Sequence, residues 1–335
     1  MKTSAVLFTA PHQVALETVE IPRPEAGEVL IESLYTLISP GTELRCLAGK
    51  EKGTTFPFIP GYSMVGRVVE RGPGASLPEG TCVFCGGTSK ASANLAWGGH
   101  VAYGVQPERD VYPLPDGVNP LHAAATKLAA IAYRGVRLAQ PKLHETVAVI
   151  GLGAIGLLAA QLHALSGARV VAADLSPYRV AMAHQAGLEA FVPQGDVGAA
   201  FRAYFPNGAD VVVDATGAPL VLAQAIEAAK DKPWNNAADL GARVVIQGSY
   251  TGEFCLLYQE IFMKELSFYV PRDVQPRDLR TMIEVIARGK LNLDALITDV
   301  RVPSSAPATY AELAEPDTEL ITVAFDWKDH GENTN

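Results

Sequence analysis

Three glycines with the spacing Gly-x-Gly-x-x-Gly form a pattern that can hold a phosphate. They are Gly151, Gly153 and Gly156, in the stretch TVAVIGLGAIGLLAAQ. The first allows a tight turn, the second lets a pyrophosphate approach the backbone, and the third lets a helix pack closely on a strand. The N-terminus of that helix, at Ala154 and Ile155, offers free N–H groups and a partial positive charge to phosphate oxygens. The spacing therefore predicts a dinucleotide site.

An acidic residue follows the glycines at the distance that the ribose of a dinucleotide requires. Asp174 ends the apolar stretch RVVAAD, and its carboxylate can accept hydrogen bonds from both ribose hydroxyls. The same carboxylate would repel the 2′-phosphate of NADP, so the sequence favours NAD. Arg179 argues the other way, because a nearby arginine can accommodate that phosphate. Thr216 and Gly248, each just past a later apolar stretch, are further expected cofactor contacts.

The segments around these residues alternate between strand-like and helix-like patterns from about residue 120 onward. Strands are expected at 146–150, 169–173, 210–213 and 243–247, and helices at 154–166, 177–185 and 219–230. A capping serine, Ser176, precedes Pro177 at the first position of the second helix. This alternation predicts βαβ units and a parallel sheet. A lone glycine motif is weak, but the strand, turn and helix around this one are the context that it requires.

The first third of the chain has a different pattern of apolar residues. Short apolar runs separated by Pro and Gly turns predict β-strands at 29–31, 66–69, 81–84 and 100–105.

The composition limits the class of protein. With 335 residues, of which 48% are hydrophobic and 19% charged, the chain is long enough for two domains with a sizeable core. A net charge of −9 without a basic run argues against a nucleic-acid partner.

No segment predicts export or membrane insertion. The N-terminus lacks the long apolar run of a signal peptide, and the longest apolar-plus-glycine run, 147–160, falls short of the roughly 20 residues that span a bilayer. Four scattered cysteines suit a reducing compartment. We therefore expect a cytoplasmic protein without a membrane partner.

Five stretches together resemble the medium-chain dehydrogenase/reductases, the zinc alcohol dehydrogenase superfamily. They are PRPEAGEVLIE (22–32), PGTELRCLAG (40–49), IPGYSMVGRVVERG (59–72), WGGHVAYGVQPERDVYPLPDG (97–117) and the glycine-rich segment. The resemblance implies an α/β protein with a GroES-like β-barrel catalytic domain, 1–120 and 296–335, and a Rossmann domain with a doubly wound parallel sheet, 121–295. The PGTE variant is similar to a zinc-poor branch that includes bacteriochlorophyllide hydroxyethyl dehydrogenases and threonine- and polyol-dehydrogenase-like proteins.

The sequence differs from the zinc-binding members of the family at the positions where those members bind their metal. They show a cysteine where this chain has Pro40, Gly-His-Glu where it has Gly61-Tyr62-Ser63, and a third ligand near the position of Lys127. Pro, Tyr and Lys do not form a zinc donor set at neutral pH, so no metal is expected. Cys82 and Cys85 lie on a predicted strand, where residues three apart face opposite sides and do not chelate one ion together.

Without zinc, an acid–base side chain must take or give the hydroxyl proton of an alcohol. Tyr62 is the first candidate, because it stands at a ligand position. Lowering its pKa from about 10 to near 7 takes roughly 4 kcal/mol, much of which a lysine ammonium such as Lys127 can supply. The alternative is that Tyr62 fills the volume that zinc left. For His100, the histidine of the segment that we expect to border the site, core packing is favoured over catalysis.

Other residues near these positions are candidates for binding. Glu43 is expected to orient a neighbouring group, although a carboxylate in a turn is as often structural. Ser39 and Thr42 can hydrogen-bond substrate or nicotinamide. Trp97 can line a substrate pocket, and by family analogy Arg272 lies near the nicotinamide ribose.

Three functions remain open. The leading hypothesis is a zinc-independent, NAD-dependent dehydrogenase that transfers a hydride between nicotinamide and a secondary alcohol or ketone. The second is an NADPH-dependent enoyl or quinone reductase, which Asp174 disfavours. The third, from another class, is a non-catalytic NAD-binding redox sensor. Family members commonly pair the edges of their Rossmann sheets, so the segment ELSFYV, 265–270, predicts a homodimer.

Overall fold

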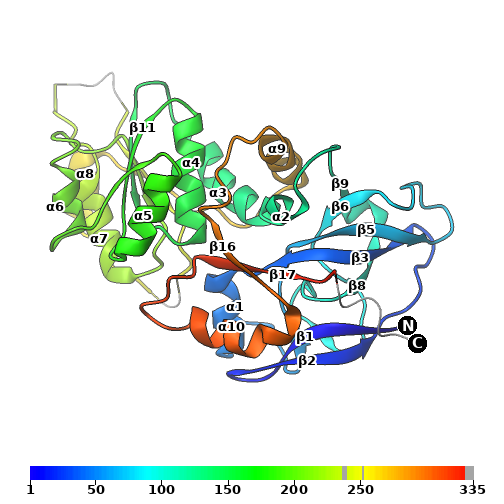
Figure 1. The fold of residues 1–335 in the computed structure, drawn as a ribbon. Helices are drawn as coiled ribbons and strands as arrows, with labels where there is room; N and C mark the ends of the chain where they lie inside the picture. The colour runs from blue at the N-terminus through cyan, green and yellow to red at the C-terminus, as the bar shows by residue number, and fades with distance from the viewer. Residues whose placement is uncertain (236–239, 251–252, 329–335) are drawn as a thin grey trace. The chain divides into compact units, whose positions relative to one another are not determined.

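The structure is a computed structural model that describes residues 1–235, 240–250 and 253–328, and the chain forms two compact units (Figure 1). The first unit comprises Met1–Lys127, Leu279–Gly289 and Ile297–Asn335, and the second comprises Leu128–Asp278 and Lys290–Leu296. The sequence-based boundaries place residues 279–289 in the nucleotide-binding domain, whereas here they group with the first unit. One contact within the first unit joins this segment to it: the Arg280 guanidinium lies 5.5 Å from the ring centroid of Tyr112.

A parallel sheet forms the centre of the second unit. In the described part of that unit, six strands follow the order β12-β11-β10-β13-β14-β15, and each pairs in parallel with its neighbours. The order starts at β10 and proceeds outward in both directions, which is the doubly wound arrangement. The strands are β10 (Thr146–Ile150), β11 (Arg169–Ala173), β12 (Glu189–Phe191), β13 (Val211–Asp214), β14 (Arg243–Ile246) and β15 (Ser267–Tyr269). The predicted α/β class and parallel sheet are confirmed.

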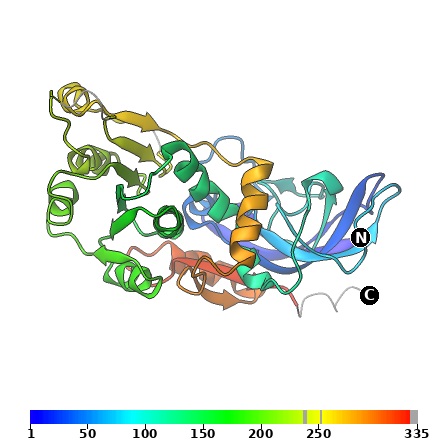
Figure 2. The same ribbon diagram turned by 90° about the horizontal axis from the view of Figure 1, so that it is seen from above.

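Helices connect these strands and lie on either side of them in Figure 2. Because both faces are covered, the strands are near-continuous buried apolar runs, as in β10. The Ser176 hydroxyl accepts a hydrogen bond from the Arg179 N–H at 3.4 Å, which is the predicted helix cap. The connecting helices are α4 (Ala154–Leu165), α5 (Pro177–Gln185), α6 (Val197–Phe201), α7 (Pro219–Ala228) and α8 (Tyr258–Lys264). Helix α3 (Thr126–Ala139) precedes β10, and α9 (Pro276–Ala287) follows β15, with most of its residues in the first unit.

A buried histidine on α4 makes the stability of the second unit depend on pH. His163 is 1% exposed, and its Nδ1 has no hydrogen-bond partner among the described residues. Burial lowers its pKa from 6.5 to about 4, with the positive charge of Arg243 adding to the effect. Between these pKa values the unfolded chain binds a proton that the folded chain does not, so stability falls as the pH drops through this window.

We therefore expect the free energy of unfolding to decrease by up to about 3 kcal/mol between roughly pH 6.5 and pH 4 on account of this side chain. Chemical denaturation followed by circular dichroism at several pH values measures the slope. His163→Leu should flatten it, whereas Leu165→Ala, at an exposed and non-titrating position of the same helix, should leave it unchanged. An equal slope in His163→Leu and in the parent protein would contradict the prediction.

The first unit is built mainly from β-strands. In its described part, one sheet follows the order β16-β17-β3-β5-β6-β9, with β8 paired to β3 as well, and a smaller sheet follows the order β2-β1-β4-β7. The strands are β1 (Lys2–Ala10), β2 (Gln13–Glu20), β3 (Glu28–Leu37), β4 (Phe58–Ile59), β5 (Met64–Arg71), β6 (Cys82–Cys85), β7 (Asn94–Leu95), β8 (Tyr103–Pro107), β9 (Tyr112–Pro113), β16 (Ile297–Arg301) and β17 (Thr322–Asp326). The predicted strand at Cys82 and Cys85 is confirmed.

Besides most of α9, the described part of the first unit contains three further short α-helices, and two of these three matter for the site. They are α1 (Pro40–Leu47), α2 (Pro120–Ala123) and α10 (Ala306–Leu313). Strand β3 leads directly into α1, which carries Thr42 and Glu43 and follows Ser39. Helix α10 contributes the buried ring of Tyr310, which packs edge-on against Phe8 with ring centroids 4.9 Å apart. The turn that carries Tyr62 lies just before β5.

Candidate active site

The glycine loop between β10 and α4 has the shape that a dinucleotide requires. Gly151 has φ of +91°, which side chains rarely tolerate, and a Cβ on Gly156 would overlap the Gly151 carbonyl oxygen. A Cβ on Gly153 would meet nothing within 4 Å, so the backbone is open to a ligand at that position. Gly153 also precedes Ala154 and Ile155 without a side-chain cap, which leaves the first N–H groups of α4 to an anion. These residues fit the pyrophosphate of a nicotinamide dinucleotide.

Asp174 is fixed beside this loop at the carboxyl end of β11. Its Oδ2 accepts a hydrogen bond from the Leu152 N–H at 2.6 Å, and its Oδ1 accepts one from the Ser176 N–H at 2.8 Å. The Arg179 guanidinium lies 3.8 Å from the same carboxylate. The structure therefore brings the predicted acid, arginine and glycine loop together.

The two other predicted cofactor contacts lie at the same edge of the sheet. A Cβ on Gly151 would lie 2.9 Å from Thr216 Cγ2, so Thr216 borders the glycine loop. A Cβ on Gly248 would overlap the backbone of Gly217, three residues past the end of β13. The carboxyl ends of β10, β13 and β14 thus converge at this edge, where doubly wound sheets bind their ligands.

The sequence reasoning missed a buried acid that orients Thr216. Asp214 is fully buried at the end of β13, and its Oδ1 accepts hydrogen bonds from the Thr216 N–H at 2.9 Å and the Thr216 hydroxyl at 2.7 Å. The Tyr250 hydroxyl donates to its Oδ2, and burial together with this carboxylate raises the pKa of Tyr250. The signal in the sequence was the short run VVVDATG, in which an acid ends an apolar strand.

Three hydroxyl groups gather in the first unit around the start of α1. The Tyr62 hydroxyl donates a hydrogen bond to Ser39 Oγ and lies 3.5 Å from Thr42 Oγ1. Tyr62 and Ser39 are buried, whereas Thr42 is only half-buried. We call Ser39, Thr42 and Tyr62 the hydroxyl cluster. The cluster unites three of the residues that the sequence analysis selected.

The expected lowering of the Tyr62 pKa is not found. Burial is the largest effect and raises the pKa of Tyr62 to about 12, because a phenolate would lose its solvation; the bonds from Ser39 and Thr42 offset this only in part. The Lys127 ammonium lies over the Tyr62 ring, 5.9 Å from its centroid. At neutral pH, Tyr62 is therefore a proton donor.

Glu43 and His100 form a fully buried pair beside the hydroxyl cluster. His100 Nε2 lies 2.9 Å from Glu43 Oε2, and Glu43 Oε1 accepts a hydrogen bond from the Ser39 N–H at 2.6 Å. The Tyr310 hydroxyl donates to the same carboxylate from α10. Both Glu43 and His100 are 0% exposed. The carboxylate therefore contacts the backbone of a cluster residue directly.

Trp97 and Arg272, which with Ser39 are the predicted pocket residues, belong to different units. Trp97 is 47% exposed in the first unit, and its ring lies edge-on against Tyr62 with centroids 5.3 Å apart. Its φ of +72° is rare for a bulky residue, and such strain is concentrated at functional sites. Arg272 is exposed in the second unit. Trp97 thus lies against the hydroxyl cluster.

Neither a metal cluster nor a membrane span is found in the described residues. Within residues 1–235, 240–250 and 253–328, no three His, Cys, Asp or Glu side chains gather as metal ligands. In the same ranges no helix has the length and hydrophobicity needed to cross a bilayer.

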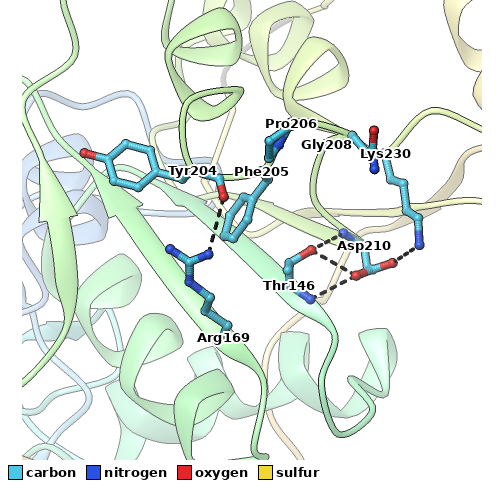
Figure 3. A pocket seen from close by; sticks show the side chains of 9 residues that line it. Thr146, Arg169, Tyr204, Phe205, Pro206, Gly208, Asp210 and Lys230 are labelled. Atoms are coloured by element: carbon cyan, nitrogen blue, oxygen red, sulfur yellow. Dashed lines mark hydrogen bonds and ion pairs between the residues drawn. The ribbon is translucent and has the colours of Figure 1, made fainter.

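A shallow pocket of about 240 Å³ lies at the opposite edge of the parallel sheet, where the strands begin (Figure 3). Its charges are satisfied within the protein. Asp210 bonds Thr146 and, at 2.8 Å, the Lys230 ammonium, and Arg169 bonds the Tyr204 carbonyl and Glu189. The charged side chains of this pocket therefore have partners within the protein.

Comparison with known proteins identifies the family. Family models match residues 25–116, as an alcohol dehydrogenase GroES-like domain, and residues 154–288, as a zinc-binding dehydrogenase. The chain is 28% identical to 2-desacetyl-2-hydroxyethyl bacteriochlorophyllide A dehydrogenase of Cereibacter sphaeroides, with 98% of this chain and 99% of that protein covered. It is 30% identical to L-galactonate-5-dehydrogenase of Escherichia coli, over 95% and 96%.

A solved structure shares the fold. The crystal structure of a putative zinc-binding dehydrogenase from Sinorhizobium meliloti 1021, bound to NADP, matches with a TM-score of 0.84 and 23% identity, and covers 97% of this chain and 99% of that one. The GroES-like domain and the Rossmann sheet expected from the sequence are thereby confirmed. The chain belongs to the medium-chain dehydrogenase/reductase superfamily of zinc-type alcohol dehydrogenase-like proteins and is an oxidoreductase of that family.

Proposed function

We propose that this protein is an NAD-dependent, zinc-independent dehydrogenase that acts on a secondary alcohol or ketone. The hydroxyl cluster is the observation that carries the proposal. Tyr62 stands where zinc members of the family have a histidine ligand, and its hydroxyl reaches Ser39 and Thr42. A chain of hydroxyl groups can donate a hydrogen bond and a proton to an oxygen that develops negative charge, which is the task of zinc in other members.

The proposed chemistry divides the work among the cluster and its neighbours. A bound nicotinamide would supply or accept the hydride. Thr42, the half-buried member, donates a hydrogen bond to the substrate oxygen. The buried hydroxyls of Ser39 and Tyr62 supply the proton that this oxygen takes up. Lys127 contributes positive charge near the Tyr62 ring, and Trp97 gives an apolar surface for the substrate. Glu43 orients Ser39 by accepting its N–H.

The choice of NAD rests on Asp174. Its carboxylate lies beside the glycine loop, where the adenosine ribose of a dinucleotide is expected. Two ribose hydroxyls would donate to it, whereas a 2′-phosphate would meet like charge. Arg179 lies within ion-pair distance of Asp174, so the carboxylate partly neutralises the charge that a phosphate would need. Both features support NAD over NADP.

Nicotinamide absorbance tests the proposed function. The protein is mixed with NADH or NADPH and a panel of ketones, and with NAD or NADP and a panel of polyols, amino alcohols and hydroxyethyl aromatics, with and without EDTA. We expect turnover with the NAD pair that EDTA leaves unchanged. Loss of activity in EDTA that added zinc restores would overturn zinc independence. Turnover confined to NADPH with enones or quinones would overturn the substrate class, and tight NAD binding without turnover would indicate a sensor.

We also propose that the protein is a homodimer joined through β15. This strand is the last in the sheet order and pairs with β14 alone among the described strands. The adjoining Val270 is 67% exposed, so an apolar edge is left open to a second copy. Light scattering should give about twice the chain mass, and Val270→Lys should shift the protein toward monomer. Leu220→Lys, at an exposed position on α7, is the matched control and should stay dimeric; a monomeric parent protein would contradict the proposal.

A further inference from the structure

His100 lies where the two segments that carry the hydroxyl cluster meet. On one side it contacts the turn that leads to Tyr62. Its N–H donates to the Pro60 carbonyl at 3.1 Å, and a Cβ on Gly61 would lie 2.6 Å from its Nε2. Gly61 also has φ of +85°, so glycine is required there both by the backbone and by the imidazole ring. The ring therefore fixes the path of the chain just before Tyr62.

On its other side His100 reaches α1 through Glu43. The Glu43 carboxylate is fully buried and accepts three hydrogen bonds from three parts of the chain: the Ser39 N–H, the Tyr310 hydroxyl and His100 Nε2. A buried carboxylate that loses one of its hydrogen-bond donors is strongly destabilised, so its side chain moves to contact another donor. The donor on His100 thus keeps Glu43 aimed at the start of α1, where Ser39 and Thr42 lie.

The hydrogen bonds of Thr36 assign the proton on the imidazole. A threonine hydroxyl has one proton and two lone pairs. The Trp327 indole N–H can only donate, and at 2.9 Å it takes one lone pair of Thr36 Oγ1. Among the described residues, the acceptor for the Thr36 proton is His100 Nδ1, at 2.8 Å. The ring proton is then on Nε2, where it faces Glu43 Oε2.

From these contacts we infer that His100 is a positioning residue for the hydroxyl cluster, acting on Tyr62 through Gly61 and on Ser39 and Thr42 through Glu43. The inference deepens the proposed function, on which its catalytic consequence rests. It goes beyond the sequence-based interpretation of His100 as core packing, because the ring makes directed bonds on both nitrogens. His100 touches no substrate in this role; it keeps the three hydroxyls in one arrangement.

Two substitutions separate the bonds of the ring from its volume. His100→Phe keeps a flat ring of similar size but removes the donor to Glu43. His100→Gln provides an amide N–H that can stand in for Nε2–H. Tyr310→Phe removes a different donor from Glu43 and leaves the contact between His100 and Gly61 in place. The three variants therefore distinguish the effect of His100 from a general loss of donors to Glu43.

The first measurement needs no substrate. Hydrogen–deuterium exchange of the purified full chain, followed by mass spectrometry, reports peptides that cover residues 36–47 and 59–66. We expect His100→Phe to speed exchange in both peptides by about tenfold, the effect of one lost hydrogen bond. His100→Gln should restore the first peptide, and Tyr310→Phe should speed exchange in the first peptide alone. A nitrogen-15 spectrum of the imidazoles should show the Nε2–H tautomer for the His100 signal, which His100→Gln removes.

The second measurement uses the ketone that the parent protein reduces with NADH. A misplaced hydroxyl cluster should lower kcat by roughly ten- to a hundredfold in His100→Phe while the KM for NADH stays the same. His100→Gln should recover most of the loss, which core filling alone would not explain, because Phe fills the space better. The KM for NADH serves as the internal control for the second unit.

Unchanged exchange in both peptides of His100→Phe would overturn the inference, and so would a Gln variant that exchanges as fast as the Phe variant. If His100→Phe does not fold, the Gln and Tyr310→Phe comparison decides by the same peptides. If the parent protein reduces nothing, the proposed function fails, whereas the exchange experiment still tests the positioning role. The two failures are therefore distinguishable.

Discussion

Tyr62→Phe is expected to lower kcat for ketone reduction by about 10²- to 10⁴-fold, the usual contribution of a positioned general acid. The substitution removes the hydroxyl that donates to Ser39 while keeping the ring against Trp97 and under Lys127. The remaining hydroxyls of Ser39 and Thr42 then have no buried proton source behind them. Stability should fall by only about 1 kcal/mol, the net value of one hydrogen bond, so the loss of rate is not a loss of fold.

The pH profile of the parent protein gives the same prediction a second readout. Because burial raises the pKa of Tyr62 to about 12, the phenol is protonated through the neutral range. Reduction needs the protonated form, so kcat/KM for the ketone should be flat as the pH rises toward that value. Oxidation of the alcohol needs the phenolate, so its kcat/KM should climb with pH over the same range. Initial rates in both directions measure the two profiles.

Tyr103→Phe is the matched control for this experiment. The Tyr103 hydroxyl also belongs to the first unit, but it donates to Glu32 at 2.7 Å, away from the hydroxyl cluster. Its removal should change neither kcat nor the pH profiles. A Tyr62→Phe variant as active as Tyr103→Phe would mean that Tyr62 fills the space of a lost metal and has no role in proton transfer.

Asp174→Ser is expected to shift cofactor preference from NAD toward NADP by about 10²- to 10⁴-fold. Hydrogen bonds to a charged group contribute roughly 1.5–3 kcal/mol each, so losing those of two ribose hydroxyls accounts for this range. The substitution also releases Arg179, whose guanidinium now lies 3.8 Å from the carboxylate. The Arg179 side chain is 31% exposed, so its released guanidinium can donate to a 2′-phosphate.

Calorimetric titration with NAD and NADP measures this shift without a substrate. The double variant Asp174→Ser with Arg179→Leu is the control for the arginine, and it should lose the gain for NADP while remaining weak for NAD. Titration of the parent protein comes first. Tighter binding of NADP than of NAD by the parent protein would show that Arg179, and not Asp174, sets the preference.

The sequence alone predicted those elements that are determined by a few neighbouring residues. Strand β10 and helix α5 have the predicted bounds, because an apolar run and a Ser-Pro cap are decided within a few residues. The glycine loop and Asp174 were found for the same reason, since one strand, turn and helix bring them together. The family resemblance supplied the positions of Tyr62 and Lys127, which no local pattern would have selected.

The environment of the hydroxyl cluster was not predictable, because it depends on distant parts of the chain. Glu43 meets His100 across 57 residues and Tyr310 across 267. The predicted lowering of the Tyr62 pKa was wrong. The sequence indicates a nearby lysine, but it does not show the burial that opposes ionisation of the phenol. Spacing identifies the residue type at a site, whereas solvation is decided only after the whole unit has packed.

The sheet order of the first unit has a consequence for protein synthesis. Strand β17 pairs with β3, although it is the last described strand of the chain, and Tyr310 precedes it. Until the ribosome has added β17, β3 has an open edge along part of its length. Until it has added α10, Glu43 lacks the hydrogen bond from the Tyr310 hydroxyl. An open edge of this kind invites pairing with other nascent chains. The second unit can therefore fold during translation, whereas the first is completed only when its C-terminal strand emerges.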